Sequence, residues 1–222
     1  MLQKSTVIYL KSLKKNNNKP WFDEHRKEYE HAKKDMEQLV QSVIDMHGKK
    51  DPLIANLKAK ECMFRINRDV RFSNDKSPYK TNFGASINGG GKKSGLAGYY
   101  IHIEPGQSFT GGGLYVPMPP ALKKVRQEID YNLEEFTKIL QSKKFKSVFG
   151  SLSEWEGVKL SRVPQGFDKD SSAAPYLLFK SYIADKPLSD DDLVDKTLVK
   201  TILDSFETLQ PLLQFLNRAL ED

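Results

Sequence analysis

The residues best suited to chemistry lie together in the middle of the chain, between positions 65 and 80. This segment combines three arginines at three-residue steps with two aspartates, two lysines and a tyrosine: Arg65, Arg68, Asp69, Arg71, Asp75, Lys76, Tyr79 and Lys80. An arginine binds phosphate or carboxylate through paired hydrogen bonds, and a lysine adds a point charge. The aspartates can hold the arginines in place or exchange protons with a bound molecule. The segment therefore predicts a site for an anionic ligand, or else a structural network of Arg–Asp pairs that ties a loop to the fold.

The positive charge of the chain is concentrated in the same region. Residues 58–93 hold nine Lys or Arg and three Asp or Glu, and this excess equals the net charge of +6 of all 222 residues. A local excess of positive charge attracts anions. The basic residues are mixed with acidic ones rather than laid out as a stripe, and no RRM, KH or helix-turn-helix signature is present. Nucleic-acid binding is therefore only a third alternative.

A histidine from another segment is expected beside this cluster. Apolar residues at 99, 101 and 103 alternate with Tyr100, His102 and Glu104, which is typical of a strand with one buried face. Arg65 lies between two apolar residues of an earlier alternating run, so it is expected on the same polar face as His102. An imidazole near carboxylates can act as a general base, although a lone histidine on a strand is more often structural. A hard metal would need these groups to converge; no metal motif is present, and no metal is predicted.

Two glycine triplets and an aromatic cluster are secondary candidates. Gly89–Gly91 is predicted to form a hairpin turn, and Gly111–Gly113 a bulge or a close approach of two backbones. Neither opens into a helix, as a phosphate-binding loop usually does. Trp21, His25 and Tyr29 are four residues apart and share one helix face. They predict aromatic packing on a sheet or, as the alternative, the wall of a pocket.

Periodicity predicts the elements that must position these residues. Apolar steps of three and four residues predict helices at both ends of the chain, over about 5–15, 20–48, 119–141 and 189–216, with Ser5 or Thr6 capping the first and a break at Pro211 in the last. Alternating patterns predict strands in between, at 62–66, 83–87, 99–103 and 109–116, the last broken by its glycines. Further short strands are predicted near 158–160 and 177–179.

These elements predict a single α+β domain over residues 1–222. Short connections favour antiparallel neighbours, so we expect a central antiparallel sheet of about four to six strands. The N-terminal and C-terminal helices should pack on one face of it. One cysteine excludes an internal disulfide framework. No apolar stretch approaches the ~20 residues of a membrane span, and no signal peptide is recognised, so a cytoplasmic location is expected.

The segment also resembles a known family motif. Eight residues stand at the spacing that defines an uncharacterised bacterial family, domain of unknown function 2461: Arg65, Arg68, Asp69, Arg71, Phe72, Asp75, Lys76 and Tyr79. The resemblance continues through Trp21-Phe22, through Tyr100-x-His102 and on to Lys180-Ser181. It implies that the basic segment, His102 and the Gly111–Gly113 turn belong to one shared site, and it implies no particular reaction.

The function expected from the sequence is binding of a phosphorylated or other anionic small molecule, and whether the protein also acts on that molecule is left open. The anion would be held by Arg65, Arg68, Arg71, Lys76 and Lys80, protons would be handled by Asp69, Asp75 or His102, and Tyr79 would orient the ligand. No dinucleotide, Walker or hydrolase signature points to a cofactor. The main alternative is a structural or protein-interaction module in which the cluster only stabilises the fold.

Overall fold

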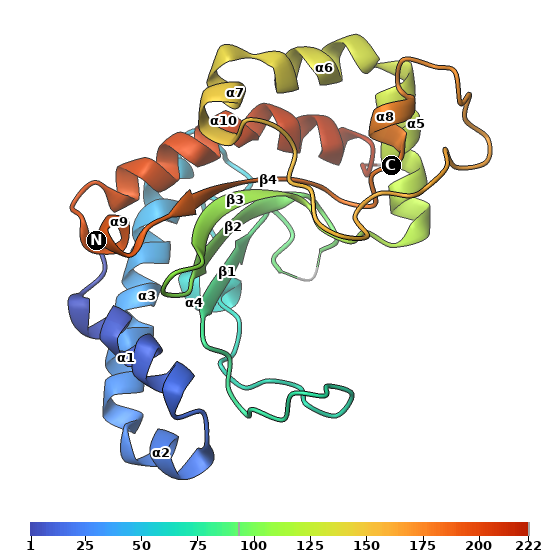
Figure 1. The fold of residues 1–222 in the computed structure, drawn as a ribbon. Coiled ribbons are helices and arrows are strands. Elements are labelled where there is room, and N and C mark those ends of the chain that lie inside the picture. Colours follow the sequence, from blue (N-terminus) through green and yellow to red (C-terminus); the bar gives the residue numbers. More distant parts are fainter. Residues whose placement is uncertain (93, 222) are drawn as a thin grey trace.

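Helices from both ends of the chain pack on one face of a four-stranded antiparallel sheet (Figure 1). The computed structural model describes residues 1–92 and 94–221; Lys93, which was counted in the basic segment, lies outside them. The sheet contains β1 (Phe83–Ile87), β2 (Gly98–Ile103), β3 (Ser108–Leu114) and β4 (Tyr182–Leu188), which are neighbours in that order. The predicted fold class is thereby confirmed.

The N-terminal helices follow the predicted apolar periodicity. They are α1 (Lys4–Lys15), α2 (Lys19–Glu24) and α3 (Arg26–His47). The predicted cap of α1 is wrong, because the helix begins at Lys4 and Gln3 is its N-cap. The Thr6 hydroxyl instead donates a hydrogen bond of 2.6 Å to the buried carboxylate of Asp35, which fastens α1 to α3. Asn18 caps α2 by accepting a hydrogen bond from the Trp21 amide.

The first predicted strand is wrong for most of its length. Residues Ala59–Cys62 form a short helix, α4, and only Met63 makes an isolated bridge to Ala85 of β1. The amide of Phe64 then donates to the carbonyl of Gly84, after which the chain leaves the sheet. Because the helix changes the phase of the side chains, Phe64 is not in the core as predicted but 39% exposed.

The last predicted strand is continuous through its glycines. β3 pairs with β2 on one side and with β4 on the other, and the predicted break at Gly111–Gly113 is wrong. A side chain at any of these three positions would meet the backbone of a neighbouring strand, within 2.0–2.3 Å of a carbonyl oxygen. The close backbone approach predicted there is confirmed. The first triplet lies in the β1–β2 connection, where the Gly91 amide closes a turn onto Asn88.

The C-terminal half returns to helices around β4. Its helices are α5 (Pro119–Tyr131), α6 (Leu133–Gln141), α7 (Lys143–Phe149), α8 (Ala174–Leu177), α9 (Asp190–Val194) and α10 (Leu198–Arg218). Ser189 caps α9 in a capping box with Asp192. The predicted break at Pro211 is wrong, because α10 continues through it. Pro211 is exposed, so its ring lies on the solvent side while the opposite face of the helix stays buried in the core.

The buried apolar residues form one continuous core between the sheet and the helices. β2 contributes Tyr99, Ile101 and Ile103, which face α3 and α10. Cys62, the single cysteine, is fully buried in this core, and burial raises the pKa of its thiol to about 11. No helix in the described part of the chain is long and apolar enough to cross a membrane.

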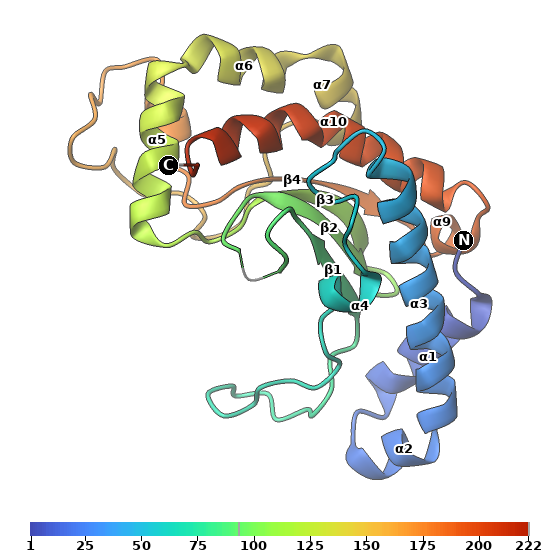
Figure 2. The same cartoon turned by 180° about the vertical axis from the view of Figure 1, so that it is seen from behind.

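Residues 64–82 form an arm that projects from the sheet on the side away from α10 (Figures 1 and 2). Its two limbs are joined by backbone hydrogen bonds from Arg68 to Pro78 and from Lys80 to Ile66. The side chain of Asn17 binds both the amide and the carbonyl of Tyr79, at 3.1 and 2.8 Å. The arm is therefore anchored to the turn between α1 and α2.

Candidate functional site

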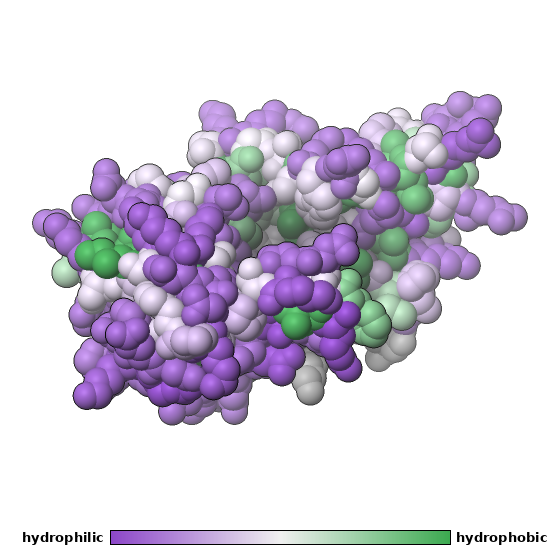
Figure 3. All heavy atoms as spheres, turned by 60° about the horizontal axis from the view of Figure 1, so that its bottom comes forward, coloured by the Kyte–Doolittle hydropathy of each residue, from purple (hydrophilic) through white to green (hydrophobic). Residues whose placement is uncertain are grey.

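The sheet face opposite α3 and α10, called the open face below, carries the candidate site. Strand register places these side chains on it: Gly84 and Ser86 of β1, Tyr100 and His102 of β2, Phe109 and Gly111 of β3, and Asp185 of β4. Figure 3 looks onto this side of the molecule and shows the surface hollowed there, with a largely hydrophilic rim. Neither Gly84 nor Gly111 has space for a side chain, because a Cβ would meet the Tyr100 hydroxyl at Gly84 and the backbone of β4 at Gly111.

His102 is the centre of a hydrogen-bonded relay on the open face. Its Nε2 donates a hydrogen bond to a carboxylate oxygen of Glu104 at 3.3 Å. Its Nδ1 lies 3.3 Å from the hydroxyl of Tyr100 and 3.5 Å from the amide nitrogen of Asn82, both of which are donors. These partners assign the neutral tautomer with the proton on Nε2. The Phe109 ring stacks on the imidazole at 4.8 Å and fixes its plane.

The charges in this relay follow from burial and from its partners. Burial lowers the pKa of His102, and the neighbouring Glu104 opposes part of this effect. Burial alone would raise the pKa of Glu104, but hydrogen bonds from Thr81 and His102 bring it below its usual value. Burial raises the pKa of Tyr100 to about 12. At neutral pH the relay therefore consists of a carboxylate, a neutral imidazole and a protonated phenol.

The space for the Tyr100 hydroxyl is provided by Gly84. A Cβ at position 84 would lie 2.5 Å from this hydroxyl oxygen and 3.5 Å from the Phe64 ring. Phe64 packs edge-on against Tyr100, with ring centroids 6.4 Å apart. The first residue of the arm thus forms one wall of the site.

Most charges on the arm are paired within the arm. Arg68 forms an ion pair with Asp75, and Arg71 forms one with Asp69 at 2.7 Å. Hydrogen bonds from Ser77 and then from Arg68 lower the pKa of Asp75, while Arg71 lowers that of Asp69. Both carboxyls are exposed and ionised at neutral pH.

The other two predicted arm residues are also held in place. Lys76 donates to the carbonyl of Val70. Tyr79 is buried, and its ring stacks on Phe22 of α2 with the ring centroids 4.0 Å apart, so it faces the N-terminal helices.

Arg65 and Lys80 differ from the other cations of the arm. Within the described residues, neither forms an ion pair with a carboxylate, although the charge of Arg65 contributes to the lowered pKa of Asp69. Burial lowers the pKa of Lys80, and the charge of Arg65 lowers it further. The Lys80 ammonium lies 5.3 Å from the centre of the Phe64 ring, which in turn contacts Tyr100. Two positive charges that form no ion pair therefore lie beside the wall of the open face.

The structure thus divides the predicted site residues into two groups. His102 lies on the open face, with Lys80 and Arg65 at its edge, whereas Arg68, Asp69, Arg71 and Asp75 are paired on the arm. Their predicted roles toward a ligand stay predictions. No three His, Cys, Asp or Glu side chains among the described residues are grouped as a metal ion would require.

Sequence reasoning did not include three contributors to the relay. Thr81 donates a hydrogen bond of 2.8 Å to Glu104, and Asn82 reaches His102. Both residues directly precede β1. Their polar side chains next to a predicted strand are the sequence feature that could have indicated a role in the site. Lys14, 3.5 Å from Glu104, comes from α1, and nothing in its local sequence distinguishes it from other surface lysines.

Comparison with known proteins gives one match. The model of a family described as "Conserved hypothetical protein (DUF2461)" matches residues 5–215. No curated protein and no solved structure matches the chain.

Proposed function

Because the chain belongs to the DUF2461 family, whose description assigns no activity, we propose a function from the open face: it binds a small anionic molecule and exchanges a proton with it. The observation that carries this proposal is the position of Arg65 and Lys80, two neighbouring cations without an ion pair among the described residues, next to the Tyr100–His102–Glu104 relay.

The cation pair supports the choice of an anion. Like charges held close together raise the free energy of the folded protein, and a bound anion relieves that repulsion. Burial is the main cause of the lowered pKa of Lys80, and the repulsion by Arg65 adds to it. An arginine and a lysine at one location suit a phosphate or a carboxylate, because the guanidinium contributes a planar pair of donors and the ammonium a mobile charge.

The relay supports chemistry on the bound molecule. Glu104 holds the Nε2 proton of His102, which leaves Nδ1 as a base directed at the Tyr100 hydroxyl. The raised pKa of Tyr100 keeps its phenol protonated at neutral pH, so in the resting relay it donates a hydrogen bond to Nδ1 of His102. Tyr100 can take a proton from a ligand while its own hydroxyl proton passes to Nδ1 of His102, and the imidazolium so formed is stabilised by the carboxylate of Glu104.

Thermal unfolding in the presence of inorganic pyrophosphate tests the binding. We expect pyrophosphate to raise the melting temperature of the wild type, because a ligand that binds only the folded state stabilises it. Lys80→Met, which keeps an apolar stem over Phe64, and Arg65→Gln should abolish the shift. Arg71→Gln is the matched control, since its guanidinium is occupied by Asp69, and should keep the shift.

The variants also separate this function from a purely structural role of the cluster. Equal pyrophosphate shifts in the wild type, Lys80→Met and Arg65→Gln would contradict the proposal. The structural alternative would be favoured if Arg68→Gln strongly lowers the free energy of unfolding while none of the tested anions stabilises the wild type. For the relay, binding of pyrophosphate should shift the imidazole resonances of His102, and His102→Gln should keep binding.

A further inference from the structure

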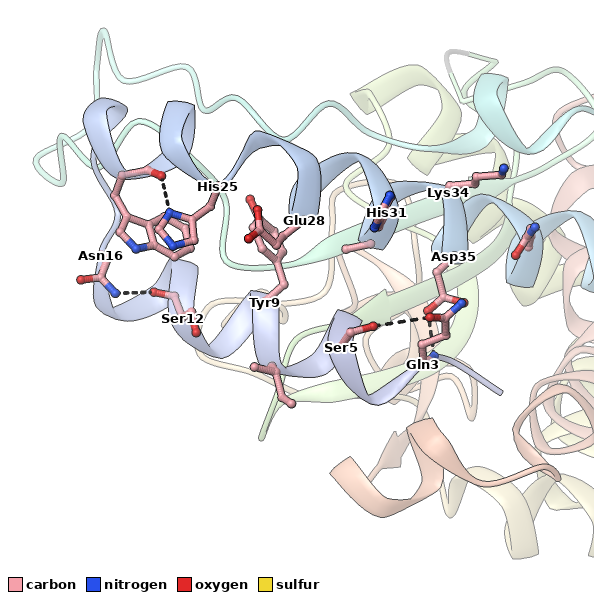
Figure 4. Close-up of a pocket in the computed structure, with 14 residues that line it drawn as sticks. Gln3, Ser5, Tyr9, Ser12, Asn16, His25, Glu28, His31, Lys34 and Asp35 are labelled. Carbon is pink, nitrogen blue, oxygen red and sulfur yellow. Dashed lines mark hydrogen bonds between the residues drawn. The ribbon is translucent and has the colours of Figure 1, made fainter.

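A second hollow lies on a different part of the molecule, between α1 and α3. It encloses about 700 Å³ and is lined by side chains of α1, α2 and α3 (Figure 4). No residue of the open face lines it. The volume is in the range of pockets that take small molecules. The groove is thus a separate candidate for binding.

Tyr9 is the unusual residue in this groove. Its side chain is only 4% exposed, yet its hydroxyl has no hydrogen-bond partner in the described part of the chain. A buried hydroxyl without a partner costs free energy. The ring is held by contacts with Trp21 and Tyr29, at centroid distances of 6.0 and 6.2 Å. Burial raises the pKa of Tyr9, so the phenol keeps its proton and remains a donor.

The Tyr9 hydroxyl is directed at a carboxylate that it does not bind. Figure 4 shows Tyr9 pointing from α1 towards Glu28 on α3. The charge of Glu28 is one of the causes that raise the pKa of Tyr9, as expected for a nearby carboxylate, but no hydrogen bond joins the two. A ligand hydroxyl can bind both groups, because it accepts from a phenol and donates to a carboxylate.

The remaining lining extends this pattern along the groove. His25 uses Nδ1 to donate to the Trp21 carbonyl at 2.9 Å, which leaves Nε2 as an acceptor. Asn16 donates through its amide nitrogen to Ser12, which leaves its carbonyl oxygen as an acceptor. The rings of Trp21 and His25 stack at 4.1 Å and form one apolar end.

The charges of the groove exclude a strong preference for anions or cations. Glu28 and Lys34 are opposite charges on α3, and the carboxylate of Asp35 is already occupied by the Gln3 amide and the Thr6 hydroxyl. What remains is a row of hydroxyl, amide and imidazole groups next to aromatic rings. We propose that the α1–α3 groove binds a neutral polyhydroxylated molecule, a sugar or a similar polyol, with the Tyr9 hydroxyl and Glu28 sharing one of its hydroxyl groups.

Titration of the isotope-labelled full-length protein with maltose, followed by amide NMR, tests this proposal. We expect saturable shifts confined to residues 5–16 and 21–38. Tyr9→Phe should weaken maltose binding about tenfold, the loss of roughly one hydrogen bond. The same variant should unfold at the same or a higher urea concentration than the wild type, because the hydroxyl it removes has no hydrogen-bond partner among the described residues. Tyr29→Phe, which removes a phenol that does not line the groove, is the matched control.

Three results would overturn the proposal: no saturable shift with maltose, shifts located on the open face, or equal affinities of Tyr9→Phe and the wild type. Glu28→Gln at an exposed position gives a second variant, which should also weaken binding and is not expected to affect folding. The pyrophosphate response of Tyr9→Phe should equal that of the wild type. Failure of this proposal is therefore distinguishable from failure of the function proposed for the open face.

Discussion

At the scale of single residues, the candidate site depends on Gly84, a residue without a side chain. The Tyr100 hydroxyl lies only 2.5 Å from the place where a Cβ of residue 84 would be, and from there it reaches His102. A charged cluster attracts attention in a sequence, whereas a glycine in a strand shows its role only when the neighbouring strand is in place. The relay therefore depends on Gly84 as much as on the residues that carry protons.

Gly84→Ala should displace the Tyr100 ring and lower the free energy of unfolding by about 1–3 kcal/mol, the usual cost of overpacking. Urea denaturation measures this cost, and the His102 imidazole resonances report the loss of the contact with Tyr100. Ser86→Ala, two residues further along the same face of β1, is the control and should have a much smaller effect. Unchanged imidazole resonances in Gly84→Ala would contradict the role given to this glycine.

A second residue, His47, makes the stability of the protein depend on pH. Its ring is buried, neither nitrogen has a hydrogen-bond partner in the described chain, and it packs edge-on against Tyr99 and Phe206. Burial lowers the pKa of His47 from 6.5, while Asp51 and Glu207 oppose the effect. Below about pH 6.5, His47 is protonated in the unfolded chain but stays neutral in the folded protein until the pH reaches its lowered pKa. The free energy of unfolding therefore falls as the pH falls.

We therefore expect His47→Phe, which retains the ring contacts, to reduce the loss of stability between about pH 7.5 and about pH 5. The reduction cannot exceed about 1.4 kcal/mol per pH unit for one group. Urea midpoints across this range measure it. His31→Gln, at an exposed position of the same helix, should follow the wild-type profile. Some dependence of the free energy of unfolding on pH should remain in His47→Phe, because burial also lowers the pKa of His102.

At the scale of elements, the arm is positioned by one side chain from another part of the chain. Asn17 forms two hydrogen bonds with the backbone of Tyr79, in the way that a neighbouring strand would. This fixes the limb that carries Lys80 relative to α1, and the Arg68–Asp75 pair closes the arm further out. The cations of the arm are thus placed by contacts with the sheet and with the turn between α1 and α2.

Asn17→Ala should release the arm without unfolding the sheet. Loss of the two hydrogen bonds should cost about 1–3 kcal/mol of unfolding free energy and increase hydrogen exchange at the Tyr79 amide. Its pyrophosphate response should also weaken. Asn16→Ala is the matched control, since among the described residues the Asn16 side chain donates to the carbonyl of Ser12 in α1 and does not bond to the arm. Wild-type exchange at Tyr79 in Asn17→Ala would refute the anchoring role.

Local periodicity predicted most elements because it is a property of short segments. It failed where the outcome depends on a distant partner. Pro211 is accommodated because it faces solvent, and Gly111–Gly113 remain in a strand because the two adjacent backbones need their lack of side chains. At the site, alternation placed His102 on one face with its two relay partners. The pairing of Arg68 with Asp75 arises from the fold of the arm, and spacing alone did not reveal it.

At the scale of the whole molecule, the C-terminal helix α10 packs against both the N-terminal helical part of the chain and the sheet. It packs on α3 and on β2 and β3, and its Arg218 forms ion pairs with Glu128 of α5 and Glu135 of α6 at 2.6 and 2.8 Å. These surface pairs add little by themselves. The shared core is what couples the N-terminal helices to the segment between α7 and β4.

The two tryptophans test whether this coupling makes the chain one cooperative unit. Trp21 lies in α2 and Trp155 between α7 and α8. In Trp21→Phe and in Trp155→Phe, the urea transition seen by the remaining tryptophan should coincide with the transition seen by far-UV circular dichroism. Separate transitions in either variant would indicate two independently folding units and would contradict the single domain predicted over residues 1–222.

The same core conceals Cys62, and this gives the native protein a built-in reporter. The thiol is inaccessible, and with a pKa near 11 little of it is the reactive thiolate at neutral pH. Alkylation by iodoacetamide must therefore wait for the molecule to open, and each alkylated chain keeps a permanent mass increment. Intact-mass measurements over time would thus give the opening rate of the unmodified protein, with or without a bound molecule.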